Sequence, residues 1–247
     1  MLYRNAGKLS QAEPLMIEQL SIEEKVSGAQ SINFALQLNF LADLYQEEGK
    51  LAEADTVMKR ALAIHIKLSG PESSLVGFHL SGLAKLAGKR QNYAEAEQLY
   101  NQALPIQEKA QGPDGLGVLT TLSDLAEIYC LQKEHSQAEA VYGRVRAIQI
   151  KSLEPGSGIV LGTVERLGSL YEKQGKFAEA EAVYRSAVES NRAALPHGHL
   201  SSIASLNDLA LFYERRDRLA EAETCYTSAL DQFGSSQPSS DSLMVQT

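Results

Sequence analysis

A period of 42 residues runs through most of this 247-residue chain and constrains its fold more than any other feature. The block Leu38–Tyr45 recurs, with the same spacing of leucine, small residue and tyrosine, at Leu122–Tyr129, Val164–Tyr171 and Leu206–Tyr213. The remaining copy, Leu80–Ala87, has alanine in place of the tyrosine. A fixed period of about 20–50 residues is the sequence signature of repeat architectures. We therefore expect an array of similar units rather than one globular core.

A second block recurs in the same register as the first. It carries alanines spaced by 42 residues, at Ala54, Ala96, Ala138, Ala180 and Ala222. An earlier copy is indicated by Ala12, 42 residues before Ala54, and by Tyr3, 42 residues before Tyr45. We divide the chain into a half repeat with the second helix only (1–28), five repeats of 42 residues (29–233) and a Ser-rich tail (234–247). The composition of the tail predicts disorder.

Each repeat is predicted to be a pair of antiparallel helices. Apolar positions 38, 41, 42 and 45 follow the spacing of one helix face. The turn into the second block ends at Gly49, and its later copies place Gln91, Lys133, Gly175 and Asp217 there. Glycine is favoured just past a helix end. Because such a pair buries its apolar face only against its neighbours, we expect an all-α solenoid of about eleven helices with the second-block alanines buried.

The repeated residues resemble a known family. The spacing of Leu41, Ala42, Tyr45, Ala54 and Ala61 resembles the tetratricopeptide repeat, and the 42-residue length resembles the variant found in kinesin light chains. HEAT repeats share a length of about 40–47 residues but not the Ala-Glu-Ala and tyrosine pattern. The resemblance implies a right-handed superhelix whose first helices line a concave, peptide-binding side, and it implies no catalysis.

A ligand is expected on the face of each first helix that lies opposite its core face. At about 100° per residue, core positions 38, 41, 42 and 45 place 36, 40, 43 and 47 on that opposite face. Stepping by 42 gives the candidate groove residues Phe40, Asp43, Phe78, Lys85, Lys89, Asp124, Glu127, Arg166, Lys173, Asp208, Leu211 and Arg215. These positions differ between copies, which fits either a solvated face or a recognition surface. Exposed apolar members favour recognition.

Composition and motifs argue against several other classes of protein. A net charge of −8 is unlike that of nucleic-acid binders, which present a basic patch. The sequence has no phosphate loop, catalytic signature or metal-binding motif, so we expect no enzyme activity, cofactor or metal. No apolar run approaches the roughly 18 residues of a membrane span. The two cysteines, Cys130 and Cys225, are expected to be reduced thiols, which favours the cytoplasm.

The function predicted from the sequence is that of a scaffold or adaptor that binds a peptide segment of a partner protein in the concave groove. The alternative is a regulatory or sensor array within a larger signalling protein. Apolar residues near both ends of the array, such as Leu15, Ile22 and Leu230, also predict self-association through uncapped ends.

Overall fold

The computed structural model describes residues 9–153 and 157–236, and this part of the chain contains eleven helices and no strand. The half repeat is α2 (Leu9–Ser27). The five pairs are α3 (Ile32–Glu47) with α4 (Leu51–Ser69), α5 (Ser74–Lys89) with α6 (Tyr93–Gln111), α7 (Leu116–Gln132) with α8 (His135–Ser152), α9 (Gly158–Lys173) with α10 (Phe177–Ala194), and α11 (Leu200–Glu214) with α12 (Leu219–Ser236). The predicted all-α solenoid of helix pairs is confirmed.

One predicted boundary is wrong by three residues. The helix α12 continues to Ser236, so residues 234–236 belong to a helix and not to the predicted tail. The remainder of that tail, 237–247, lies outside the described residues, as do Tyr3 and the junction at 154–156.

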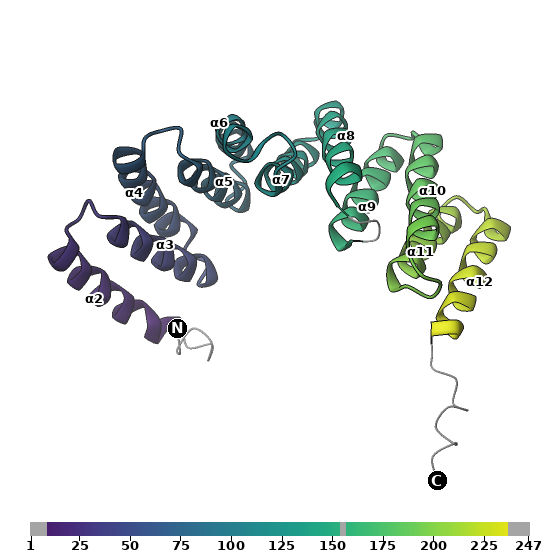
Figure 1. Ribbon diagram of the computed structural model, residues 1–247, viewed down its shortest axis with the longest axis horizontal. Helices are drawn as coiled ribbons and strands as arrows, with labels where there is room; N and C mark the ends of the chain where they lie inside the picture. The colour runs from purple at the N-terminus through teal and green to yellow at the C-terminus, as the bar shows by residue number, and fades with distance from the viewer. Residues whose placement is uncertain (1–8, 154–156, 237–247) are drawn as a thin grey trace, which may run out of the picture. The chain divides into compact units, whose positions relative to one another are not determined.

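The chain divides into two compact units within the third repeat. Unit 1 ends at Lys133 and contains α2 to α7, and unit 2 begins at Glu134 and contains α8 to α12. In each unit every helix packs on the next one along the chain, as Figure 1 shows. First helices of consecutive repeats also touch, α5 with α7 in unit 1 and α9 with α11 in unit 2. Neighbouring first helices therefore form a common face in each unit.

The core of each repeat lies where the second-block alanines meet neighbouring helices. Ala54, Ala96, Ala138 and Ala180 are 0% exposed, and Ala222 is 4% exposed, as predicted. One core cluster of unit 1 joins three helices through Ala42, Ala54, Met58, Leu83 and Leu86. Alanine at the closest approach lets two helices come together without a void or an overlap. The 42-residue period thus marks the interior of each unit.

Left-handed turns end the first helix of every repeat. Positions 49, 91, 133, 175 and 217 all have positive φ, with values of 75° at Gly49, 61° at Gln91, 62° at Lys133, 73° at Gly175 and 57° at Asp217. This conformation reverses the chain within a few residues and starts the second helix. Three of the five positions carry a side chain that this conformation disfavours.

Hydrogen bonds from tyrosine to glutamate connect each of several first helices to the second helix before it. The tyrosine hydroxyl donates to a glutamate that directly follows a second-block alanine. The pairs are Tyr129 with Glu97 at 3.2 Å, Tyr171 with Glu139 at 3.4 Å and Tyr213 with Glu181 at 2.9 Å. The repeated tyrosine therefore sets the register between consecutive repeats. Where alanine replaces it, at Ala87, Arg90 instead pairs with Asp55 at 3.2 Å.

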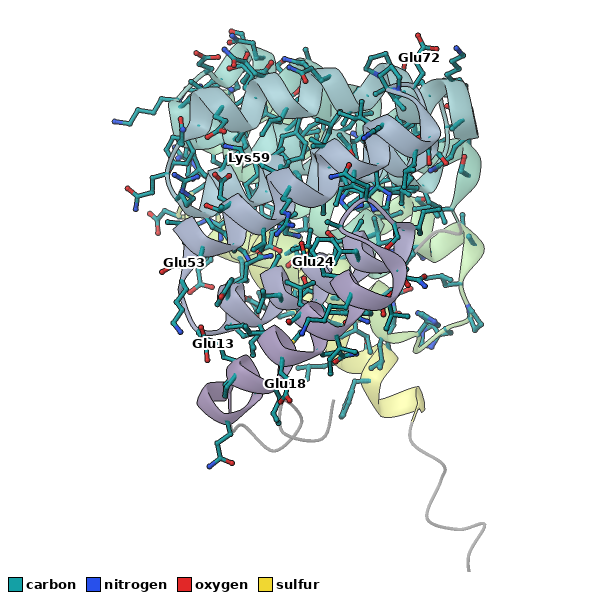
Figure 2. All side chains as sticks on the ribbon, turned by 90° about the vertical axis from the view of Figure 1, so that its left-hand side faces the viewer. Glu13, Glu18, Glu24, Glu53, Lys59 and Glu72 are labelled. Atoms are coloured by element: carbon teal, nitrogen blue, oxygen red, sulfur yellow. The ribbon has the colours of Figure 1, made fainter. Side chains whose placement is uncertain are left out.

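Ion pairs add to the same junctions. Lys50 Nζ lies 2.6 Å from Glu13 Oε2 in unit 1, and the equivalent pairs of unit 2 are Lys176 with Glu139 and Arg218 with Glu181, each at 2.6 Å. Figure 2 shows Glu13 and Glu24 on α2 and Lys59 on α4, on the face turned to the viewer. There Lys59 pairs with Glu95 of α6 at 2.9 Å. Exposed pairs of this kind contribute only about 0–1 kcal/mol each, so they align repeats more than they stabilise them.

Candidate functional site

Two pockets lie on the common faces formed by first helices, one in each unit. The unit-2 pocket is a cavity of about 500 Å³ lined by Glu165, Ser169, Glu172, Lys173, Tyr184, Asp208, Leu211 and Arg215. The unit-1 pocket is a cavity of about 190 Å³ lined by Asn39, Ala42, Asp43, Met58, Leu75, Phe78, His79 and Gly82. Four lining positions correspond at a distance of 126 residues, namely 39 with 165, 43 with 169, 58 with 184 and 82 with 208. The repeat therefore forms a pocket at the same place twice.

An ion pair forms one wall of the unit-2 pocket. Arg215, the residue that follows α11, donates two hydrogen bonds from its guanidinium to Glu172 of α9, Nη2 to Oε1 at 2.7 Å and Nε to Oε2 at 3.1 Å. The Tyr184 hydroxyl from α10 also donates to Glu172, at 3.3 Å. The hydrogen bond to Glu172 is the main cause that raises the pKa of Arg215. This wall joins three helices and satisfies its own charges.

Tyr184 forms the floor of the unit-2 pocket because Gly168 leaves room for its ring. A Cβ atom at position 168 would lie 2.3 Å from Cζ of Tyr184, much closer than carbon atoms approach. The equivalent residue in the other first helices is alanine: Ala42, Ala84, Ala126 and Ala210. Burial, followed by the Glu172 carboxylate, raises the pKa of Tyr184. The tyrosine is therefore a neutral hydrogen-bond donor at the base of the pocket.

Two further carboxylates line this pocket, and each lies seven residues, or about two helical turns, before a member of the ion pair. Asp208 of α11 is half-buried, and Glu165 of α9 is exposed at the rim. Burial, followed by the charge of Glu165, raises the pKa of Asp208, and Arg215 opposes that shift. The unit-2 pocket thus has an ion-paired wall and an acidic wall, with Leu211 as its exposed apolar member.

The unit-1 pocket is smaller and more apolar. Phe78 is 50% exposed at its edge, and His79 is 9% exposed within it. The ring of His79 stacks on the buried ring of His65 with centroids 4.4 Å apart, and His79 Nε2 lies 3.4 Å from Asn39 Nδ2. Gly82 keeps this pocket open, because a Cβ there would lie 3.1 Å from the terminal methyl of Met58.

The pockets account for half of the candidate groove residues predicted from the sequence. Lys173, Asp208, Leu211 and Arg215 line the unit-2 pocket, and Asp43 and Phe78 line the unit-1 pocket. The other six lie outside both pockets: Phe40, Lys85, Lys89, Asp124, Glu127 and Arg166.

Two of these six candidates, Lys85 and Lys89, contact other groups of unit 1. Lys85 Nζ lies 4.0 Å from Asp124 Oδ2, and Lys89 donates to Gln46 Oε1 at 2.9 Å. Both ammonium groups therefore already have partners within the protein, while their long side chains remain exposed.

The family follows from comparison with known proteins. The sequence profile described as tetratricopeptide repeat matches residues 33–109, 76–151 and 160–234, which together span more than half of the chain. The chain belongs to the tetratricopeptide repeat family. A comparison with curated protein sequences gives no match.

Several solved structures share this fold at low sequence identity. The putative kinesin light chain of Podosopora anserina, with nearly identical TPR-like repeats, is 24% identical, has a TM-score of 0.70, and covers 85% of this chain and 99% of its own. BtubC (BKLC) from P. vanneervenii is 20% identical, with a TM-score of 0.69 and coverages of 93% and 91%. YrrB, titled a TPR protein with an unusual peptide-binding site, is 13% identical, with a TM-score of 0.50 and coverages of 86% and 90%. The predicted resemblance to kinesin-light-chain repeats is confirmed.

Four lining residues of the unit-2 pocket were not predicted from the tetratricopeptide pattern. Glu165 and Glu172 lie one position away from the face that we derived, Ser169 lies on that face but was not among the candidates, and Tyr184 belongs to a second helix. A signal for two of them is present in the sequence. The twelve-residue spacing of Glu172 and Tyr184 recurs at Glu214 and Tyr226, where the tyrosine hydroxyl again donates to the glutamate, at 3.0 Å.

Metal and membrane features are not found in this tetratricopeptide array as far as the structure describes it. In residues 9–153 and 157–236, no group of three or more His, Cys, Asp or Glu side chains is placed to hold a metal ion. In the same ranges no helix is both long and apolar enough to cross a membrane.

Proposed function

We propose that this protein is an interaction scaffold that binds extended peptide segments of partner proteins along the common faces of its first helices. The observation that carries the proposal is the pair of pockets at equivalent places, one on α3 and α5 and one on α9 and α11. A peptide that crosses consecutive first helices would place a side chain in each pocket it meets.

Exposed apolar side chains support the same faces as binding surfaces. Phe40, Phe78 and Leu211 are 40%, 50% and 44% exposed on first helices. Such residues lose water when a partner covers them, and buried apolar contacts at the centre of an interface give much of its affinity. The proposed role is binding rather than catalysis, in a reducing compartment such as the cytoplasm, which the half-buried thiols of Cys130 and Cys225 support.

Selection of displayed peptides on the full chain tests this proposal. Binding of the selected peptide is then measured by fluorescence anisotropy for the wild type, for Phe78→Asp and for Leu211→Asp. We expect Phe78→Asp to weaken a peptide bound on unit 1, and Leu211→Asp to weaken a peptide bound on unit 2, by about tenfold or more, which corresponds to about 1.4 kcal/mol.

Matched controls place the same charge on second helices. Ile66 of α4 and Ile150 of α8 are 39% and 75% exposed, so Ile66→Asp and Ile150→Asp should leave the affinity within about twofold. Failure to select any peptide, or equal losses in the controls and in the first-helix variants, would contradict the proposal.

A further inference from the structure

Equivalent tyrosine hydroxyls have different hydrogen-bond partners in the two units. In unit 1, Tyr100 of α6 is hydrogen-bonded to Asp124 of α7, and burial together with this carboxylate raises the pKa of the tyrosine. In unit 2 the equivalent residues, 84 positions later, are Tyr184 and Asp208. There the tyrosine hydroxyl donates to Glu172 instead, at 3.3 Å.

Glu172 is the reason for the difference. Its equivalent in unit 1 is Gly88, which offers no carboxylate, so Tyr100 turns to Asp124. In unit 2 Glu172 receives both the Tyr184 hydroxyl and the Arg215 fork. Two of the donors that line the pocket, Tyr184 and Arg215, therefore bind Glu172.

Asp208 consequently faces the unit-2 pocket without a hydrogen bond from the described residues. Its carboxylate is half-buried, and burial together with the charge of Glu165 raises its pKa. A partly desolvated carboxylate without a donor is unfavourable, and a second carboxylate beside it adds repulsion. A cation between the two removes both penalties.

We propose that the unit-2 pocket binds a lysine or arginine side chain of the partner peptide, with its charged group between Asp208 and Glu165. This inference rests on the proposed peptide-binding function. The aliphatic part of the side chain lies along Leu211 and the ring of Tyr184, which line the same cavity. The cavity of about 500 Å³ has ample room for one such side chain.

Charge complementarity favours a basic side chain over other occupants. Among the lining residues Glu165, Glu172 and Asp208 carry three negative charges, and Lys173 and Arg215 carry two positive charges. Arg215 is already paired with Glu172, so an acidic side chain would find only Lys173 available. Among the described residues, no three or more His, Cys, Asp or Glu side chains are placed to hold a metal ion, so the three carboxylates of this pocket do not form such a group.

The experiment uses the peptides selected on the full wild-type chain. We expect a lysine or arginine at one fixed position of the selected sequences. Asp208→Asn should weaken binding of the selected peptide by about tenfold, and replacing the basic residue of the peptide by glutamine should weaken binding to the wild type similarly. The two changes together should cost no more than either alone, which shows that they remove one interaction.

Glu223→Gln on α12 is the matched control, because it removes one negative charge from an exposed site of the same unit. A loss as large as that of Asp208→Asn would indicate general attraction to the acidic chain and overturn the inference. Selected peptides without a basic residue, bound at faces still sensitive to Leu211→Asp, would overturn this inference alone. No selected peptide, or binding indifferent to both first-helix variants, would overturn the proposed function as well.

Discussion

Single residues determine how closely the helices of each unit approach. Alanine recurs wherever a second helix crosses its neighbours and allows the helices to approach closely. Gly168 allows the ring of Tyr184 to approach α9 in the same way, at the base of the unit-2 pocket. Polar residues follow the same period: each of four second helices buries one polar side chain, at His65, Gln107, Gln149 and Asn191. Gln149 donates to Thr163 Oγ1 at 2.8 Å and Asn191 donates to the Ser201 carbonyl at 3.1 Å. These buried donors fix contacts that apolar packing alone would leave free to slide.

Replacement of a buried alanine tests the assigned register. Ala180 is 0% exposed, so Ala180→Leu should force neighbouring helices apart and lower the free energy of unfolding by about 1–3 kcal/mol. Ala182, two residues along the same helix, is exposed, and Ala182→Leu should change stability by less than about 0.5 kcal/mol. Denaturant unfolding measures both variants. Equal stability of Ala180→Leu and the wild type would show that the register is wrong.

The stacked histidines predict a pH-dependent stability of unit 1. Burial, followed by the charge of His65, lowers the pKa of His79 to about 4, and burial lowers the pKa of His65. His65 is 0% exposed, and neither of its ring nitrogens has a hydrogen-bond partner among the residues that the structure describes. Because the unfolded chain binds protons more readily, the stabilisation is complete above about pH 6.5 and falls as the pH drops toward 4.

Thermal unfolding between pH 7 and pH 4 checks this expectation. His65→Leu removes one of the two buried rings and should flatten the decline, whereas His197→Gln, at an exposed position of unit 2, should retain it. The same slope in the wild type and in His65→Leu would show that other groups cause the acid sensitivity.

At the scale of helices, the boundaries were largely predictable, because each depends on local chemistry repeated five times. The left-handed turn position could be read from Gly49 and Gly175 and extended to Gln91, Lys133 and Asp217 by counting 42 residues. The alanine register is equally local. Only six of the sixteen lining residues of the two pockets were predicted, because the linings depend on small rotations of helices and on choices between competing partners.

Tyr184 illustrates what the pattern could not supply. Its periodic position predicts a core residue, and it is indeed only 3% exposed. Its hydroxyl nevertheless donates a hydrogen bond to Glu172, so Asp208 faces the cavity without that donor. That outcome depends both on Gly168, which lies on α9, and on Arg215, which follows α11, and no pattern in the sequence connects the two residues.

Relief of backbone strain at one turn tests how the left-handed conformation affects the stability of the protein. Gln91 is exposed and has φ of 61°, a conformation that costs an L-residue roughly 1–2 kcal/mol and costs glycine almost nothing. After the greater flexibility of glycine in the unfolded state is taken into account, Gln91→Gly should stabilise the protein by about 0.5–1 kcal/mol.

The reverse change, Gly49→Gln, should destabilise the protein by a similar amount, because Gly49 has φ of 75°. A Cβ at this position would contact no other atom, so the backbone conformation alone causes the expected loss. Denaturant midpoints of the two variants measure the effect. If both variants lost stability, the backbone conformation would not be the controlling factor.

At the scale of the whole molecule, apolar side chains on the first and last described helices remain exposed. Leu15 and Ile22 of α2 are 49% and 54% exposed, and Leu230 and Phe233 of α12 are 69% and 49% exposed. We expect association that increases with protein concentration, because contact between such faces removes apolar surface from water. Sedimentation velocity over a range of concentrations measures this association, and a monomer at high micromolar concentration would contradict it.

The most direct test of the account is an amide NMR titration of the isotopically labelled full chain with a selected peptide. We expect the chemical-shift changes to concentrate on first helices, on α3 and α5 with Phe78 for a peptide bound to unit 1, or on α9 and α11 with Leu211 for a peptide bound to unit 2. Residues on the outer faces of second helices, such as Glu53 of α4, should remain unchanged (Figure 2). Changes that concentrate on those outer faces, with first helices unaffected, would contradict the account.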